Sequence, residues 1–119
     1  MAIGATPRTD SVALTSTTAT TVKAGPAAGI DRYIKHIKVV NGGAQTTYTL
    51  GLKASTTAPA AGDPGLIALT RTIAANSAED LAFAGDGLKW TNGSTFNLNG
   101  SAAAGTQVNI HLIYNEVVA

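Results

Sequence analysis

The stretch Val108-Asn109-Ile110-His111-Leu112-Ile113-Tyr114 carries the clearest structural signal in this chain. Large apolar side chains stand at every second position from Val108 to Tyr114, and most of the positions between them are polar. Such alternation is typical of a half-buried β-strand, because successive side chains of a strand point to opposite sides. We therefore predict a strand here, with Leu112 on its buried face and Ile113 pointing outward.

Strand signals of the same kind recur through the rest of the sequence. Residues 32–40 are rich in β-branched and aromatic residues, and in residues 46–53 Thr or Gly alternates with larger apolar side chains. Clusters of Gly, Pro and Asn separate the strand-like segments roughly every ten residues. Shorter strands are predicted at 11–15, 19–23, 66–73, 79–83 and 95–99, with loops at 54–65 and 99–105.

This pattern predicts an all-β protein, and the fold that we expect is a single antiparallel β-sandwich of jelly-roll type with an extended N-terminal arm. Residues 1–30, rich in Ala, Thr, Ser and Gly, are expected to form that arm or edge strands, and residues 31–119 the sandwich domain. Within the first strong strand we expect Tyr33 to share a face with Ile37 and Val39. The predicted core consists of Ile37, Val39, Tyr48, Leu50, Leu52, Phe96, Leu98, Val108, Ile110 and Leu112.

Charge is scarce, at 13% of residues with a net charge of +1. That balance argues against electrostatic capture of nucleic acid or of an anionic membrane as the main activity. The sequence contains 1 Trp, 1 Met, 2 Phe and 3 Tyr, so the core is expected to be thin and to gain from contacts with a partner. The N-terminal residues lack the charged and apolar regions of a secretion signal, so we expect synthesis in the cytoplasm.

Candidate metal ligands are few. His36 and His111 could meet across paired strands, with Asp31 or Glu116 completing a site, but nothing in the sequence fixes the ligand spacing that zinc or iron requires. The absence of cysteine from the 119 residues excludes disulfides and thiolate ligands within them. We therefore expect no metal and no cofactor.

Catalytic motifs are also missing from the sequence. Glu79 and Asp80 are adjacent, so on a strand they point to opposite faces and cannot form the opposed carboxyl pair of a glycosidase. No serine stands in a Gly-x-Ser-x-Gly elbow, and the glycines of residues 100–105 lack the Lys-Ser/Thr of a phosphate-binding loop. We expect no catalytic residues and predict that the protein is not an enzyme.

Two aromatic residues, Trp90 and Tyr33, could stack on a sugar, as in carbohydrate-binding modules. In a sequence with a single tryptophan and few other large apolar residues, we favour the interpretation of Trp90 as a core anchor.

The segments 33–41, 48–52 and 73–81 resemble small virion structural proteins of tailed bacteriophages, of the capsid decoration (cement) type. The first ends in Val39-Val40-Asn41, and the last begins Ile73-Ala74-Ala75-Asn76-Ser77. The resemblance covers roughly residues 31–119 and brings no catalytic residues with it. It implies a protein that binds the major capsid protein on the outer surface of a phage head, as a homo-oligomer that we expect to be a trimer.

Two alternatives stay open at this stage. One is a tail, neck or fibre subunit of the same kind of particle. The other is a small carbohydrate-binding β-sandwich module, whose partner would be a glycan. Under the favoured interpretation the protein is made in the cytoplasm of a host bacterium and ends on the capsid surface of the virion.

Overall fold

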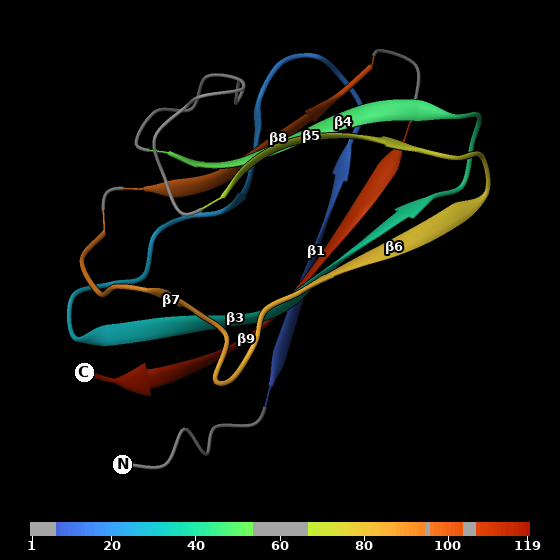
Figure 1. Cartoon of the computed structure of the whole chain (residues 1–119). Coiled ribbons are helices and arrows are strands. Elements are labelled where there is room, and N and C mark those ends of the chain that lie inside the picture. The colour runs from blue at the N-terminus through green and yellow to red at the C-terminus, as the bar shows by residue number, and fades with distance from the viewer. Residues whose placement is uncertain (1–6, 54–66, 95, 104–106) are drawn as a thin grey trace.

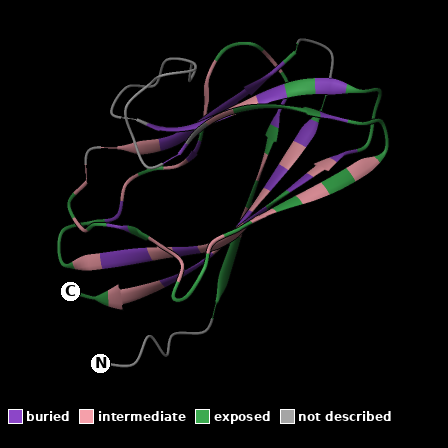
Figure 2. Ribbon diagram, viewed as in Figure 1, coloured by how far each residue is buried: buried purple, intermediate pink, exposed green. Residues whose placement is uncertain are grey.

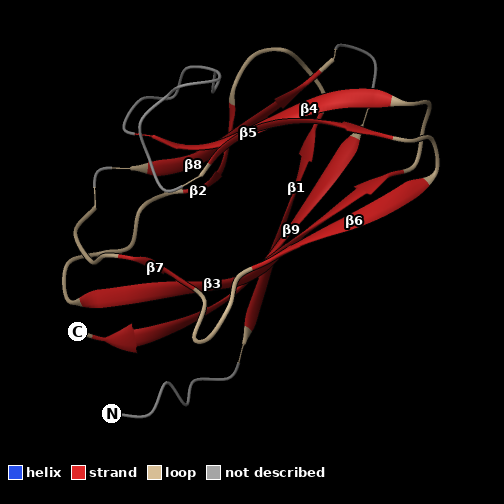
Figure 3. Cartoon of the chain, viewed as in Figure 1, coloured by secondary structure: helices blue, strands red, loops and turns tan. Residues whose placement is uncertain are grey.

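The computed structural model describes residues 7–53, 67–94, 96–103 and 107–119. These residues form strands, turns and loops, and the part of the chain that is described contains no helix (Figure 3). The described residues therefore contain no helix that is long and apolar enough to cross a membrane. The predicted loop at 54–65 lies outside the described residues.

The described chain folds into two antiparallel sheets that face each other (Figure 1). One sheet has the strand order β1-β9-β3-β6, with a short β7 also paired to β3, and consists of β1 (Arg8–Leu14), β9 (Val108–Val118), β3 (Ile30–Asn41), β6 (Ser77–Ala82) and β7 (Leu88–Trp90). The other has the order β2-β8-β4-β5 and consists of β2 (Thr20–Lys23), β8 (Asn97–Ala102), β4 (Thr46–Lys53) and β5 (Ala68–Ile73). The predicted all-β, two-layered architecture is confirmed.

The pairing of the strands is nested along the sequence. When the short β7 is left aside, the first strand pairs with the last and the second with the one before it, as β1–β9 and β2–β8. The series continues inward with β3–β6 and β4–β5. The pairs β3–β9 and β4–β8 then complete the two sheets.

The N-terminal region contributes one strand to each sheet. Residues 8–14 pair with β9, and residues 20–23 pair with β8, in both cases as the outermost strand. Leu14 and Val22 are buried in the core between the sheets. Residues 8–23 are thus edge strands and their connection, whereas residues 1–6 of the predicted arm lie outside the described part.

The core lies between the sheets, where Figure 2 shows the buried positions alternating along the strands. On β9, Val108, Ile110 and Leu112 are 0% exposed and Tyr114 is 3% exposed, as the alternation predicted. All the predicted core residues are buried except Phe96, which is partly buried and packs against the core.

The predicted face of Tyr33 is wrong. The register of β3 against β9 shifts between Ile34 and His36, which is a β-bulge with an extra residue on β3. An inserted residue reverses the alternation, so Ile34 is the residue that joins Ile37 and Val39 in the core. Tyr33 lies on the outer face and is only partly buried.

The predicted loop at 99–105 is also wrong in its first part, because β8 continues to Ala102. Gly100 lies in the middle of this strand, opposite Leu50 on β4. A Cβ at Gly100 would come within 2.9 Å of the Leu14 side chain and 3.0 Å of the Leu50 side chain. Glycine is therefore needed here because side chains of other strands fill the space, and it does not mark a turn.

Replacing Leu112 with alanine tests the register of β9. Leu112 is 0% exposed, so Leu112→Ala should lower the free energy of unfolding by about 2–5 kcal/mol, measured by chemical denaturation. Ile113→Ala, one position along on the outer face, is the matched control and should cost much less. A loss at Leu112 below about 0.5 kcal/mol, the size typical of surface substitutions, would contradict this register.

Candidate functional site

A buried arginine joins the two sheets. Arg32 on β3 is 5% exposed, and its Nε and one terminal nitrogen donate hydrogen bonds to Glu116 Oε2 at 3.0 and 2.8 Å. Its other terminal nitrogen donates to the carbonyl of Ala24 at 2.8 Å. Glu116 belongs to β9, and Ala24 directly follows β2 of the opposite sheet. The guanidinium group therefore links the two layers of the sandwich.

Aromatic rings and further charges surround Arg32. Its guanidinium carbon lies 4.8 Å from the centre of the Trp90 ring and 5.2 Å from that of Tyr114. The Tyr114 hydroxyl donates to Asp10 at 2.9 Å, and Asp10 also pairs with Lys23 at 2.6 Å. The charges of this cluster are paired with one another, so we interpret it as a structural network.

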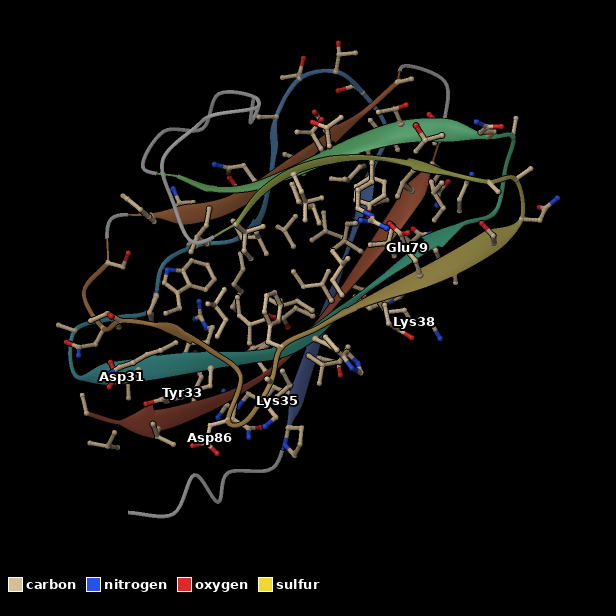
Figure 4. All side chains as sticks on the ribbon, in the orientation of Figure 1. Asp31, Tyr33, Lys35, Lys38, Glu79 and Asp86 are labelled. Atoms are coloured by element: carbon tan, nitrogen blue, oxygen red, sulfur yellow. The ribbon has the colours of Figure 1, made fainter. Side chains whose placement is uncertain are left out.

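A second charged group lies at the β5–β6 side of the sandwich. Tyr48 donates its hydroxyl hydrogen bond to Glu79, and Arg71 binds the same carboxylate through two nitrogens at 2.9 and 3.2 Å. The hydrogen bond from Arg71 holds the pKa of Glu79 below its ordinary value, while burial raises the pKa of Tyr48 well above its own. Glu79 points between the sheets (Figure 4), whereas Asp80 is exposed on the outer face, as their adjacency predicted.

The four candidate metal ligands are not brought together. His36 pairs with Ile113 across β3 and β9, which places it two residue positions from His111 on the same outer face. Glu116 lies on the inner face with Arg32, and Asp31 accepts hydrogen bonds from the backbone and side-chain nitrogens of Asn92, each at 2.9 Å. Within the described ranges, no three His, Cys, Asp or Glu residues lie close enough together to hold a metal ion.

A serine–histidine pair lies on the same outer face. Ser11 Oγ is 2.7 Å from His111 Nδ1, and the two residues are direct partners in the β1–β9 register. Direct cross-strand neighbours commonly form such a bond. In the described part of the chain no carboxylate hydrogen-bonds to His111, so the pair lacks the orienting acid of a hydrolytic triad.

The two candidate sugar-stacking residues face in opposite directions. Trp90 is 0% exposed and belongs to the core, where it lies against Arg32. Tyr33 pairs with Lys89 and lies on the outer face of the sheet (Figure 4). The two rings therefore cannot form one platform for a sugar.

The two outer faces differ in charge. On the β1-β9-β3-β6 sheet, the outer face carries charged side chains that include Lys35 and Lys38 (Figure 4). On the β2-β8-β4-β5 sheet, Tyr48, Leu50 and Leu52 are buried on the inner face, and the register shows which described side chains lie on the outer face. These outward side chains are all uncharged: Thr21, Thr47, Thr70 and Thr72 are exposed, Thr49 and Asn97 are partly buried, and Asn99 and Ser101 are buried. We call this surface the threonine face.

An open groove runs between the edge strands β5 and β6. It is lined by Ile67, Leu69, Arg71, Asp80, Leu81, Ala82 and Phe83. Leu69, Leu81 and Phe83 are only partly buried, so the groove presents apolar surface to solvent. Neither the groove nor the Arg32 network is indicated by a local sequence pattern, because each depends on which distant strands become neighbours.

Comparison with known proteins gives little further information. No family model matches the chain, and no curated protein matches it. Among solved structures, it is similar to a protein from Bacillus endospore appendages, described as a family of disulfide-linked pili. That similarity covers 99% of this chain and 94% of the other, with 15% identity and a TM-score of 0.45.

Removing the Arg32 side chain should strongly destabilise the protein. Arg32→Ala leaves Glu116 without its buried partner, and breaking a buried pair in this way costs about 3–5 kcal/mol. Arg8 pairs with the same carboxylate from an exposed position, with 62% of its side chain accessible, so Arg8→Ala should cost about 1 kcal/mol or less. Equal losses in chemical denaturation would contradict the structural role of Arg32.

The stability of the protein should fall at both extremes of pH. A hydrogen bond from Lys23 lowers the pKa of Asp10, and one from Arg71 lowers that of Glu79. Stability from such carboxylates is present above their ordinary pKa, about 4, and is lost as the pH falls below it. The hydrogen bond to Asp10 raises the pKa of Lys23, and burial raises that of Tyr48, so their contribution is lost as the pH rises above about 10.

Thermal unfolding measured from pH 2 to 11 should therefore show a plateau between about pH 5 and 9. Tyr48→Phe should reduce the loss on the alkaline side, and Asp10→Asn the loss on the acid side. A melting temperature that rises below pH 4 or above pH 10 would contradict these assignments.

Proposed function

We propose that this chain is a non-enzymatic structural protein that binds the outer surface of a phage head and stabilises it, as a capsid decoration protein. The observation that carries the proposal is the threonine face, a sheet surface whose described side chains are uncharged. Thr, Asn and Ser side chains can form hydrogen bonds across a protein–protein interface without the cost of burying an ion.

The pairing of charges within the chain supports the same conclusion. Among the residues that the structure describes, the intramolecular ion pairs join Arg8, Lys23, Arg32, Arg71 and Lys89 to Asp10, Asp31, Glu79 and Glu116. Few charges are left for long-range attraction to nucleic acid or to a membrane surface. Large parts of this surface can therefore be buried against other protein subunits without leaving many charged groups buried and unpaired.

We assign the sandwich to the jelly-roll class. The nested pairing of β1–β9, β2–β8, β3–β6 and β4–β5 supports the assignment, because wrapping a long antiparallel hairpin around a core produces this order. Double-sheet jelly rolls occur in viral capsid proteins and also in lectins. The class is thus compatible with a virion protein without selecting it over a carbohydrate-binding module.

The proposed partners are the major capsid protein and further copies of this chain. The proposed location is the capsid surface of the virion, after synthesis in the cytoplasm of the host bacterium. The support for a phage head in particular is the resemblance of segments 33–41, 48–52 and 73–81 to decoration proteins.

Binding to heads that lack the protein tests the proposal. The wild-type chain should bind such heads saturably, at a fixed ratio to the major capsid protein, in a sedimentation assay. Thr47→Lys places a charge at an exposed position of the threonine face and should weaken binding at least tenfold. Ala78→Lys places the same charge on the exposed outer face of the other sheet and should leave binding unchanged.

A short deletion tests the predicted arm separately. Removing residues 2–6 leaves β1 intact, whereas a deletion that reached residue 24 would remove both β1 and β2.

Failure of the wild-type chain to bind heads would contradict the proposal. Binding confined to tails would favour the tail, neck or fibre alternative, and specific binding to a glycan array would favour the carbohydrate-binding module.

A further inference from the structure

The outermost strands of the two sheets are not equally open to pairing with another strand. Sheet edges are commonly protected by inward-pointing charges, short strands and register shifts. Arg8 and Asp10 point inward from β1, and β2 has only 4 residues and a register shift. On the β6 side, Glu79 and Asp80 occupy the middle of the strand, and β7 has only 3 residues.

The remaining edge, β5, lacks such protection. It has 6 residues, and Arg71 is its only charged residue. Glu79 of the same chain neutralises Arg71 through nitrogen–oxygen contacts of 2.9 and 3.2 Å. Its outward side chains at Thr70 and Thr72 are exposed and uncharged. Strand β5 is therefore the edge where an additional strand meets the least electrostatic opposition.

The hydrogen bonds of β5 show which of its backbone groups have no partner among the described residues. The Leu52 N–H donates to the carbonyl of Ile67 at 2.8 Å, so these opposite residues form a hydrogen-bonded pair. Bonded and non-bonded pairs alternate in an antiparallel ladder. The backbone N–H and C=O groups of Leu69, Arg71 and Ile73 therefore point toward β4. Those of Ala68, Thr70 and Thr72 point the other way, toward the outer edge of the sheet.

We propose that β5 pairs antiparallel with β5 of a second copy of this chain, about a twofold axis at Thr70. The inference rests on the proposed assembly function, but it replaces the trimer expected from the resemblance with a twofold contact. The two four-stranded sheets would become one continuous sheet, and the threonine faces of both copies would lie side by side.

The register follows from the backbone groups at the outer edge and from the charges. With Thr70 opposite Thr70 of the second copy, Ala68 lies opposite Thr72. The residues whose backbone N–H and C=O groups point toward the outer edge are therefore paired only with one another. Leu69 then lies opposite Arg71 of the second copy. Centring the axis on Arg71 would place two guanidinium groups opposite each other, which is unfavourable for directly paired residues. A self-complementary strand of this kind is what a twofold interface requires.

The groove beside β5 completes the contact. In this register Arg71 of the second copy points into the groove, whose wall includes Leu69, Leu81 and Phe83. Asp80 also lines the groove and forms no ion pair within the described residues. The side chain of Arg71 is 49% exposed, so it can lie between its own Glu79 and Asp80 of the other copy. Charge complementarity thus favours a second copy as the occupant.

Sedimentation equilibrium of the full chain at rising concentration tests the proposal. The wild type should reach twice the monomer mass, and Thr70→Pro should raise the dimer dissociation constant at least tenfold. The Thr70 N–H faces solvent, and proline is tolerated on edge strands when the lost N–H is not paired within the sheet. Ala78→Lys, on the exposed outer face of the other sheet, should remain dimeric.

Oxidative cross-linking supplies a second readout, which a folding defect in the proline variant cannot imitate. The chain has no cysteine, so Thr70→Cys introduces a single thiol at the proposed axis. Opposite residues in bonded antiparallel pairs have Cα atoms about 5.5 Å apart, within the range that a disulfide spans. Thr70→Cys should give covalent dimers at least tenfold faster than Ala78→Cys on the exposed face of the other sheet.

The outcomes separate this inference from the proposed function. A monomer at every concentration, or a trimer whose mass is unchanged by Thr70→Pro, would overturn the β5 contact even if the protein binds heads. A dimer that Thr70→Pro dissociates, together with no binding to heads, would support the contact and contradict the function.

Discussion

The pairing of β3 with β9 is the interaction on which the rest of the structure depends. Their register runs from Ile30–Val118 to Asn41–Val108, and the inner face of this pair carries much of the core. β1 attaches to one side of the pair, and β6 and β7 attach to the other. At one end Arg32 ties the pair to the second sheet through the carbonyl of Ala24. At the other end the Asn41 side chain donates to the carbonyls of both adjoining turns.

A small core and a low charge content have a common consequence in this protein. The charges that are present mostly serve the fold, as in the network around Arg32 and the contact of Glu79 with Arg71 and Tyr48. The surface that remains is dominated by hydroxyl, amide and methyl groups, most clearly on the threonine face. Such a surface suits contact with other proteins in a regular assembly, where burial against neighbours supplements a thin core.

The sequence predicted what depends on local alternation and missed what depends on distant partners. Alternation was sufficient to place Leu112 in the core. It could not place Ile34, because the bulge in β3 is defined only against β9. Gly100 looked like a loop residue because the two leucines that exclude a side chain there come from other strands. The pairing of Arg32 with Glu116 joins residues 84 positions apart, so no local pattern indicates it.

Electron cryomicroscopy of phage heads incubated with this protein is the most direct test of the central claim. We predict density on the outer surface of the head, at a fixed position on the lattice, into which the sandwich fits with its threonine face against the capsid. Heads without added density, or density that fits only with the charged face of the β1-β9-β3-β6 sheet toward the capsid, would contradict the account.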